Sequence, residues 1–369
     1  MDVQVPVAGG VERKSLLPNL RHMERPDLSQ TEPAVRAYVE ALEAEIDHLR
    51  AEATPATEEP VRDAEPPLEP SEPPTTFNLI TLSAQGNVKR TARHLYSRQR
   101  RGGMGIFDLE TPEADPPAAL LIADEAQNLV VITDQARAFR LPVNTLPASP
   151  IRSRGQPLAE LLALGSGERP AVVLADHGRG YLLLLTARGY VRVMPAHLVG
   201  EKMAPGLALY KSADFGPPVS ACWTPGDSDL FIATRQGLAI RFPEKQMPLP
   251  GGIGIRLEPG DEAIAIASVR ADGSIFLLGA DGKGTVRLMS GFNANKAPGG
   301  GGKIAMKTDR LIGAVAVKDT DDLFIISRLS KLIRFRANDI PAKDGVVQGV
   351  HCMALRADET TAICVSPAA

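Results

Sequence analysis

Aromatic residues are scarce in this 369-residue chain, at 4% with a single tryptophan. Cysteine is rarer still: Cys222, Cys352 and Cys364 lie far apart without CxxC spacing. That pattern predicts reduced thiols packed as small core residues and argues against a disulfide framework. No apolar run approaches the roughly 18 residues that span a bilayer. The first residues, Met-Asp-Val-Gln, have neither the basic start nor the apolar core of a signal peptide, so a cytoplasmic protein is expected.

Glycine and proline are abundant instead, with 33 and 31 residues, and the glycines recur in step. Six times, a short apolar segment runs into a small residue, and a basic residue follows three or four positions later. A second glycine comes 17 to 19 residues after the small residue. Repeats of roughly 50 residues with a turn glycine are typical of propeller blades. The sequence therefore predicts an all-β, six-bladed β-propeller over residues 77–366. The small turn residues are Gly86, Ala136, Gly189, Gly237, Gly284 and Ser330.

The region before the repeats divides into three parts. Residues 1–30 have scattered prolines and no period, which predicts an irregular tail. Residues 31–52 predict an amphipathic helix with the four-three spacing of a coiled-coil seam. Residues 53–76 are rich in proline and glutamate and predict an extended acidic linker. The seam suits a homo-oligomer or a partner helix, and packing on the chain's own propeller explains it equally well. Its residues are Val35, Val39, Leu42, Ile46 and Leu49.

Charge is divided unevenly, although the net charge is only −3. Residues 1–76 hold 7 Lys or Arg and 16 Asp or Glu. Residues 77–107 hold six basic and no acidic residues, residues 108–282 hold 15 and 20, and residues 283–369 hold 13 and 8. In a closed ring the last blade lies beside the first. Blades 5, 6 and 1 therefore form one basic sector, which would attract a polyanion.

One motif points to a known family. Residues 98–105 read Arg-Gln-Arg-Arg-Gly-Gly-Met-Gly. This resembles the gyrase-A box, Gln-Arg-Arg-Gly-Gly-Lys-Gly, in the C-terminal domain of the A subunits of DNA gyrase and topoisomerase IV. Six of seven positions match, and Met104 stands where the family has lysine. The resemblance covers residues 77–366 and implies a β-pinwheel, a propeller-like disc with strands exchanged between blades. It also implies that DNA bends around the rim and that the box closes the ring.

The implied function is non-enzymatic: largely sequence-independent binding and bending of double-stranded DNA, as an architectural or topoisomerase-accessory factor. The breakage-reunion portion is expected to be absent, because none of the five tyrosines follows an arginine as that family's catalytic tyrosine does. No cofactor or metal is expected, because the histidines lack ligand spacing. The expected partners are duplex DNA and a type IIA topoisomerase subunit, on a bacterial nucleoid. A protein-interaction propeller that has lost DNA wrapping is the alternative.

The predicted DNA-binding residues are mostly cations of blades 5, 6 and 1, which can contact phosphates without reading sequence. They follow the repeat turns or belong to the box. The mildly acidic blades 2 to 4 oppose continued contact with DNA, so a partial bend is expected. Arg192 and Arg241 lie on the acidic side and are expected to contribute less to DNA binding. The set is Lys89, Arg90, Arg93, Arg98, Gln99, Arg100, Arg101, Arg287, Lys303, Arg334 and Arg336.

Overall fold

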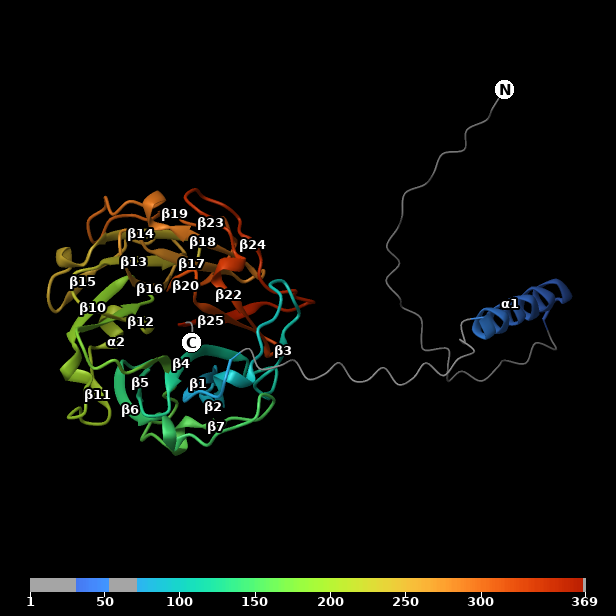
Figure 1. Ribbon diagram of the computed structural model, residues 1–369, viewed down its shortest axis with the longest axis horizontal. Helices are drawn as coiled ribbons and strands as arrows, with labels where there is room; N and C mark the ends of the chain where they lie inside the picture. The colour runs from blue at the N-terminus through green and yellow to red at the C-terminus, as the bar shows by residue number, and fades with distance from the viewer. Residues whose placement is uncertain (1–30, 53–71, 368–369) are drawn as a thin grey trace, which may run out of the picture. The chain divides into compact units, whose positions relative to one another are not determined.

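The computed structural model describes residues 31–52 and 72–367, which fall into two separate units (Figure 1). The first unit contains helix α1, Pro33–Glu52. Two of its apolar heptad residues, Val35 and Leu42, are 47% and 45% exposed. Self-association through this helix stays a prediction. The expectations for residues 1–30 and for most of the linker lie outside the described residues.

The second unit is a ring of six blades, which confirms the predicted six-bladed propeller (Figure 1). Each blade is a four-stranded sheet, and blade 5 gains a fifth strand. From the centre outward, blade 1 comprises β4 (Pro117–Asp124), β1 (Phe77–Ser83), β2 (Asn87–Ala92) and β7 (Gln156–Pro157). Blade 2 comprises β8 (Pro170–Ala175), β5 (Asn128–Thr133), β6 (Arg137–Pro142) and β11 (Leu207–Ala208). Blade 3 comprises β12 (Pro218–Thr224), β9 (Tyr181–Thr186), β10 (Tyr190–Pro195) and β15 (Gly251–Ile253).

The second half of the ring repeats this order. Blade 4 comprises β16 (Ala263–Val269), β13 (Asp229–Thr234), β14 (Leu238–Pro243) and β19 (Lys303–Ile304). Blade 5 comprises β20 (Leu311–Val317), β17 (Ser274–Gly279), β18 (Lys283–Leu288) and β23 (Ala342–Lys343), with β24 (Val350–His351) also on β18. Blade 6 comprises β25 (Thr360–Ser366), β21 (Asp322–Ser327), β22 (Lys331–Arg336) and β3 (Ile106–Phe107).

A short 3-10 helix follows the central hairpin of every blade. These helices are η2 (Arg93–Leu95), η3 (Val143–Thr145), η5 (Ala196–Val199), η6 (Glu244–Gln246), η7 (Met289–Gly291) and η8 (Ala337–Asp339). Two further single turns, η4 (Leu158–Glu160) and α2 (Ser212–Phe215), lie in the connections.

The outermost strand of each blade comes from the segment that follows the next blade's hairpin. Strand β7 follows the hairpin of blade 2 and pairs with β2 of blade 1. Strand β19 follows the hairpin of blade 5 and pairs with β14 of blade 4. Strand β3 follows the hairpin of blade 1 and pairs with β22 of blade 6. The last exchange closes the ring at the junction of blades 6 and 1, which we call the seam.

Each central hairpin turns on a small residue with positive φ. The angle is 78° at Gly237 and 59° at Ala136, and the amide of Gly237 donates to the carbonyl of Thr234 at 3.1 Å. In blade 5 the turn residue is Gly282, with φ 75°. The prediction of Gly284 was wrong, because Gly284 lies inside β18. Both glycines fit the repeat spacing, and only the strand pairing decides between them.

The hydrophobic core consists of six clusters, one at each junction between neighbouring blades. Central strands are buried on both faces because each packs against two adjacent sheets. The junction of blades 1 and 2 has 14 buried residues, including Ile80 and Val131. The seam cluster has only eight, including Leu79 and Phe324. The junction of blades 2 and 3 has nine, so the seam cluster is the smallest by a single residue.

A buried arginine adds a polar link between blades 4 and 5. Arg241 of β14 pairs with Asp229 of its own blade (Nη2–Oδ2 2.7 Å). Its Nη1 also donates to the carbonyls of Met289 and Phe292 in the next blade, at 2.7 and 2.9 Å. The carbonyl of Met289 also accepts the Phe292 amide, so Arg241 gives it a second donor, and the carbonyl of Phe292 accepts from Arg241 directly after η7. We call this arrangement the interblade clamp.

Replacing Gly237 with alanine should destabilise the propeller by about 2–4 kcal/mol. The left-handed φ disfavours any side chain, and the new Cβ would lie 2.4 Å from the carbonyl oxygen of Met306. The matched change Ala136→Gly should shift stability by less than about 1 kcal/mol, because relief of strain is offset by a more flexible unfolded chain. Urea unfolding followed by circular dichroism measures both. Equal effects at the two turns would contradict this account.

Replacing Arg241 with methionine should cost about 3–5 kcal/mol, because Asp229 and the carbonyl of Phe292 lose their buried partner and the carbonyl of Met289 loses one of its two donors. The control is Arg235→Met, whose ion pair with Glu262 is half exposed on both sides. That change should cost less than about 1 kcal/mol. Comparable losses in urea unfolding would show that Arg241 acts as an ordinary surface residue.

Candidate nucleic-acid interface

Lys89 lies in the interior of the protein. Its side chain is fully buried, and Nζ donates to Asp108 Oδ1 at 2.5 Å and to the carbonyl of Ile151. The same carboxylate accepts hydrogen bonds from Tyr96 and Thr81. Burial lowers the pKa of Lys89, and the Asp108 carboxylate opposes that shift. Lys89 therefore holds blade 1 together, and its predicted place on the DNA-facing surface is corrected.

Three more of the predicted cations are internal. Arg93, Arg287 and Arg334 are 3%, 4% and 0% exposed. Arg287 donates to the carbonyl of Ala305 at 3.2 Å, and burial lowers its pKa. A strand side chain that follows the turn points into the junction between blades, where basic groups bind backbone carbonyls. The spacing that suggested a basic rim therefore marks buried strand positions at Arg287 and Arg334. Arg93 begins η2 and is buried as well, so all three are withdrawn from the surface set.

Other predicted residues lie partly at the surface. The Arg90 side chain is 12% exposed and lies 4.0 Å from Glu125. Arg98 pairs with Asp322 through Nε at 2.8 Å. Gln99 is half-buried and its amide contacts the carbonyl of Leu332. These side chains are engaged within the protein and offer little charge to a ligand.

The box lies across the seam, against β22 and the segment that follows β24. The Gly102 amide donates to the carbonyl of Cys352 at 2.9 Å, and the carbonyl of Gly103 accepts from the Ala354 amide at 2.9 Å. Arg101 donates to the carbonyls of Asp339 and His351, at 2.9 and 2.5 Å. Most of the box therefore joins blades, as the resemblance implied, and Arg101 contributes to that joining.

Arg100 and Arg336 are exposed, and no hydrogen bond or ion pair is recorded for either side chain in the described part of the chain. Lys303, on the outer strand of blade 4, is half-buried, with Nζ 4.1 Å from the ring centre of Phe292. Burial and the nearby charges of Arg287, Lys296 and Arg241 lower the pKa of Lys303. Cations crowded in this way favour binding of an anion.

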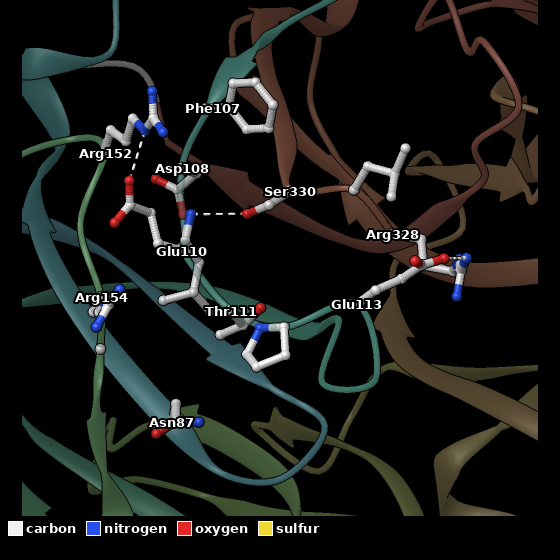
Figure 2. Close-up of a pocket in the computed structure, with 14 residues that line it drawn as sticks. Asn87, Phe107, Asp108, Glu110, Thr111, Glu113, Arg152, Arg154, Arg328 and Ser330 are labelled. Atoms are coloured by element: carbon white, nitrogen blue, oxygen red, sulfur yellow. Dashed lines mark hydrogen bonds and ion pairs between the residues drawn. The ribbon is translucent and has the colours of Figure 1, made fainter.

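A second group beside the seam was not predicted from the sequence. Figure 2 shows exposed Phe107 at the edge of a cleft of about 880 Å³. Lys331 and Arg152 lie 3.5 and 5.5 Å from its ring centre, and Arg152 also pairs with Glu110 at 2.6 Å. Arg154 is exposed on the same cleft. The sequence feature that could have identified Arg154 is its position directly before Gly155, the second repeat glycine of blade 2.

Metal and membrane sites find no support in residues 31–52 and 72–367. No group of three His, Cys, Asp or Glu side chains there could hold a metal ion. No helix in this part is long and apolar enough to cross a membrane.

Comparisons with known proteins agree with the fold. The chain is 28% identical over 293 residues to the A subunit of DNA gyrase from Escherichia coli (strain K12), covering 76% of this chain and 33% of that protein. It is 26% identical over 292 residues to the corresponding gyrase subunit from Mycoplasma genitalium, covering 76% and 35%. The chain thus spans about a third of the length of these curated relatives.

Solved structures show the same architecture. The C-terminal domain of DNA gyrase A superposes with a TM-score of 0.67 at 20% identity, covering 78% of this chain and 99% of that one. The C-terminal domain of DNA topoisomerase IV gives 0.55 at 19% identity, covering 79% and 94%. The family described as "DNA gyrase C-terminal domain, beta-propeller" matches residues 78–114, 127–168, 180–202, 228–270 and 321–365. These segments make up more than half of the sequence and lie on five of the six blades, so the chain belongs to this family.

Proposed function

We propose that the pinwheel binds and bends duplex DNA along the rim of its basic sector, without reading base sequence. It would act as an architectural or topoisomerase-accessory factor on the nucleoid. The observation that carries this proposal is a set of cations on or beside the outer strands for which no carboxylate pairing is recorded in the described residues. The set is Arg100, Arg154, Lys303, Lys331 and Arg336.

Phosphate contacts explain why such a surface suits DNA of any sequence. Each cation that neutralises a phosphate releases condensed counterions, and this supplies affinity without base contacts. The family membership and the name of the relatives, DNA gyrase, support DNA as the polyanion. Bending stiff duplex costs several kcal/mol and must be offset by contacts along the bend. Because blades 2 to 4 are mildly acidic, with 15 basic and 20 acidic residues in residues 108–282, the favoured path covers about half of the disc.

Replacing Arg100 and Arg336 together by alanine should weaken binding to random duplex and lower the salt slope by about 1–2 units. Neither side chain supports the fold, so urea unfolding should be unchanged. The control replaces Lys202 and Lys211, exposed cations outside the basic sector, and should leave the slope intact. Fluorescence anisotropy across salt concentrations measures all three proteins. An unchanged slope in the Arg100/Arg336 variant would remove these residues from the DNA site.

The acidic N-terminal segment should compete with DNA for the basic sector. Residues 1–71 hold 7 Lys or Arg and 15 Asp or Glu. Deleting them should tighten DNA binding at low salt, and the gain should fade above about 0.1 M, where the Debye length falls below about 10 Å. The deletion stops before Glu72, because that side chain is packed into the propeller. Affinity that is unchanged at low salt would show that the segment does not compete.

A specific observation favours protein docking on the other half of the rim. Leu207, Leu249 and Ile253 are 38%, 65% and 59% exposed on or beside the outer strands of blades 2 and 3. Such apolar residues suit a protein partner, for which a type IIA topoisomerase subunit is our candidate. If random duplex fails to bind at any salt concentration, a protein-interaction propeller becomes the better-supported function.

A further inference from the structure

The seam contains a buried ionic network. At its centre is Glu72, which precedes β1 and lies outside the six repeats. Its carboxylate accepts hydrogen bonds from Arg93 Nε and Nη2 at 2.8 and 3.0 Å, and from Arg334 Nη2 at 3.0 Å. Arg334 and Arg98 both also bind Asp322, at 2.5 and 2.8 Å. Three guanidinium groups therefore share two carboxylates.

Part of this network is the ordinary interblade clamp. Arg334 donates to the carbonyls of Arg93 and Tyr96 in blade 1, at 3.2 and 2.8 Å. These contacts repeat those of Arg241 between blades 4 and 5. The seam differs from the junction of blades 4 and 5 in having the additional Arg93 side chain and its partner Glu72. The other five blades begin the corresponding 3-10 helix with Val143, Ala196, Glu244, Met289 and Ala337, none of which is cationic.

The chain path gives a reason for the addition. At the other junctions, the inner strand of one blade continues directly into the next hairpin, as from Asp124 at the end of β4 to Asn128 at the start of β5. The seam lacks this connection, because β25 ends at Ser366 and β1 begins at Phe77. Arg93 Nη1 donates to Ser366 Oγ at 2.6 Å and to the carbonyl of Pro367 at 3.2 Å.

Arg93 thus holds the end of the last strand and, through Glu72, the segment that leads into the first. The network stands where the other junctions have continuous chain. The apolar cluster at the seam is also among the smaller ones, so polar links there add to a limited apolar contact. Burial by itself raises the pKa of Glu72, but hydrogen bonds and charge from Arg334 and Arg93 outweigh it, and the pKa is lowered. The carboxylate is therefore held as the anion that Arg93 and Arg334 require.

We propose that Glu72 is a positioning residue that closes the ring. By neutralising Arg93 and Arg334, it holds blade 1 on blade 6 and keeps the box in place across the seam. The consequence for DNA rests on the proposed function: a duplex crossing from blade 6 to blade 1 needs a closed seam to bend against. Without Glu72, two adjacent buried cations would repel each other and the seam would open while the remaining junctions hold.

Amide hydrogen exchange tests ring closure without DNA. At the seam, the Asp108 amide donates to the carbonyl of Ser330 at 2.9 Å, and the Ala305 amide makes the corresponding bond to Gly237 at the junction of blades 4 and 5. In Glu72→Gln, exchange at Asp108 should accelerate by about tenfold or more, while Ala305 keeps its protection. An Asp108 amide that exchanges in Glu72→Gln at the same rate as in the original protein would overturn the proposal.

A compensating variant covers the case in which Glu72→Gln unfolds the whole ring. Replacing Arg93 by glutamine as well removes the cation that Glu72 alone pairs with, while Arg334 keeps Asp322 as its partner. Protection at Asp108 should therefore return part of the way toward the original value, because the bonds of Arg93 to Ser366 and Pro367 are also lost. If Glu72 acted only by filling space, replacing Arg93 would not restore protection at Asp108. A double variant no better protected than the single one would therefore also overturn the proposal.

The DNA arm uses energy transfer between the ends of a short duplex. Glu72→Gln should reduce bending, and Arg93→Gln in the same chain should restore it. If the original protein does not bend DNA, the proposed function fails, and the exchange result alone decides ring closure. If bending is normal while Asp108 exchanges rapidly, a closed seam is not needed for bending and that part of the inference is refuted.

Discussion

Everything in this molecule depends on how each blade is joined to the next. A four-stranded sheet cannot bury its two faces alone, so the core exists only as clusters between neighbouring blades. Exchange of the outer strands adds backbone hydrogen bonds across every junction. Arginine adds a further link at the junction of blades 4 and 5 and at the seam, where one guanidinium joins a carboxylate of its own blade to carbonyls of the next. Guanidinium suits this position because its donors can satisfy several acceptors at once.

This use of arginine changes how the charge of the chain should be interpreted. The basic sector is strong when charges are counted along the sequence, yet several of its cations are internal. Lys89 and Arg334 neutralise buried carboxylates, and Arg287 binds backbone carbonyls. The charge that remains at the rim is smaller and more local, around Arg100, Arg336 and Lys303. A modest positive field would suit the limited arc of DNA contact that we propose better than a complete wrap.

The seam shows what a closed ring requires of a linear chain. Five junctions are crossed by chain that runs onward from inner strand to hairpin, and the sixth is not. The box provides one link across the sixth junction, because it leads into β3, which pairs with β22 of blade 6. The Glu72 network supplies a second, because it joins the segments at both ends of the propeller. The segment before the first blade is therefore part of the closed ring and acts as more than a tether.

Periodicity in the sequence determined the number of blades and their order. A turn residue that must adopt positive φ, followed by a strand with alternating side chains, leaves a mark every 45 to 53 residues that can be read without a structure. The same periodicity allowed two choices in blade 5, and only strand pairing selected Gly282. The box was visible as a motif, and it lies across the seam as the resemblance implied.

The direction of each basic side chain was decided by tertiary structure. A strand residue can face the neighbouring blade or the solvent, and a shift of one position exchanges the two. Arg334 and Arg336 are two positions apart on β22, so strand alternation places them on the same face. Arg334 is nevertheless buried, while Arg336 is exposed as the last residue of the strand, and sequence spacing could not separate the two. The partners of the buried cations are also distant in sequence: Glu72 lies 262 residues before Arg334. Such pairings exist only after the ring has closed, because closure brings the two ends of the propeller together and removes water from between them.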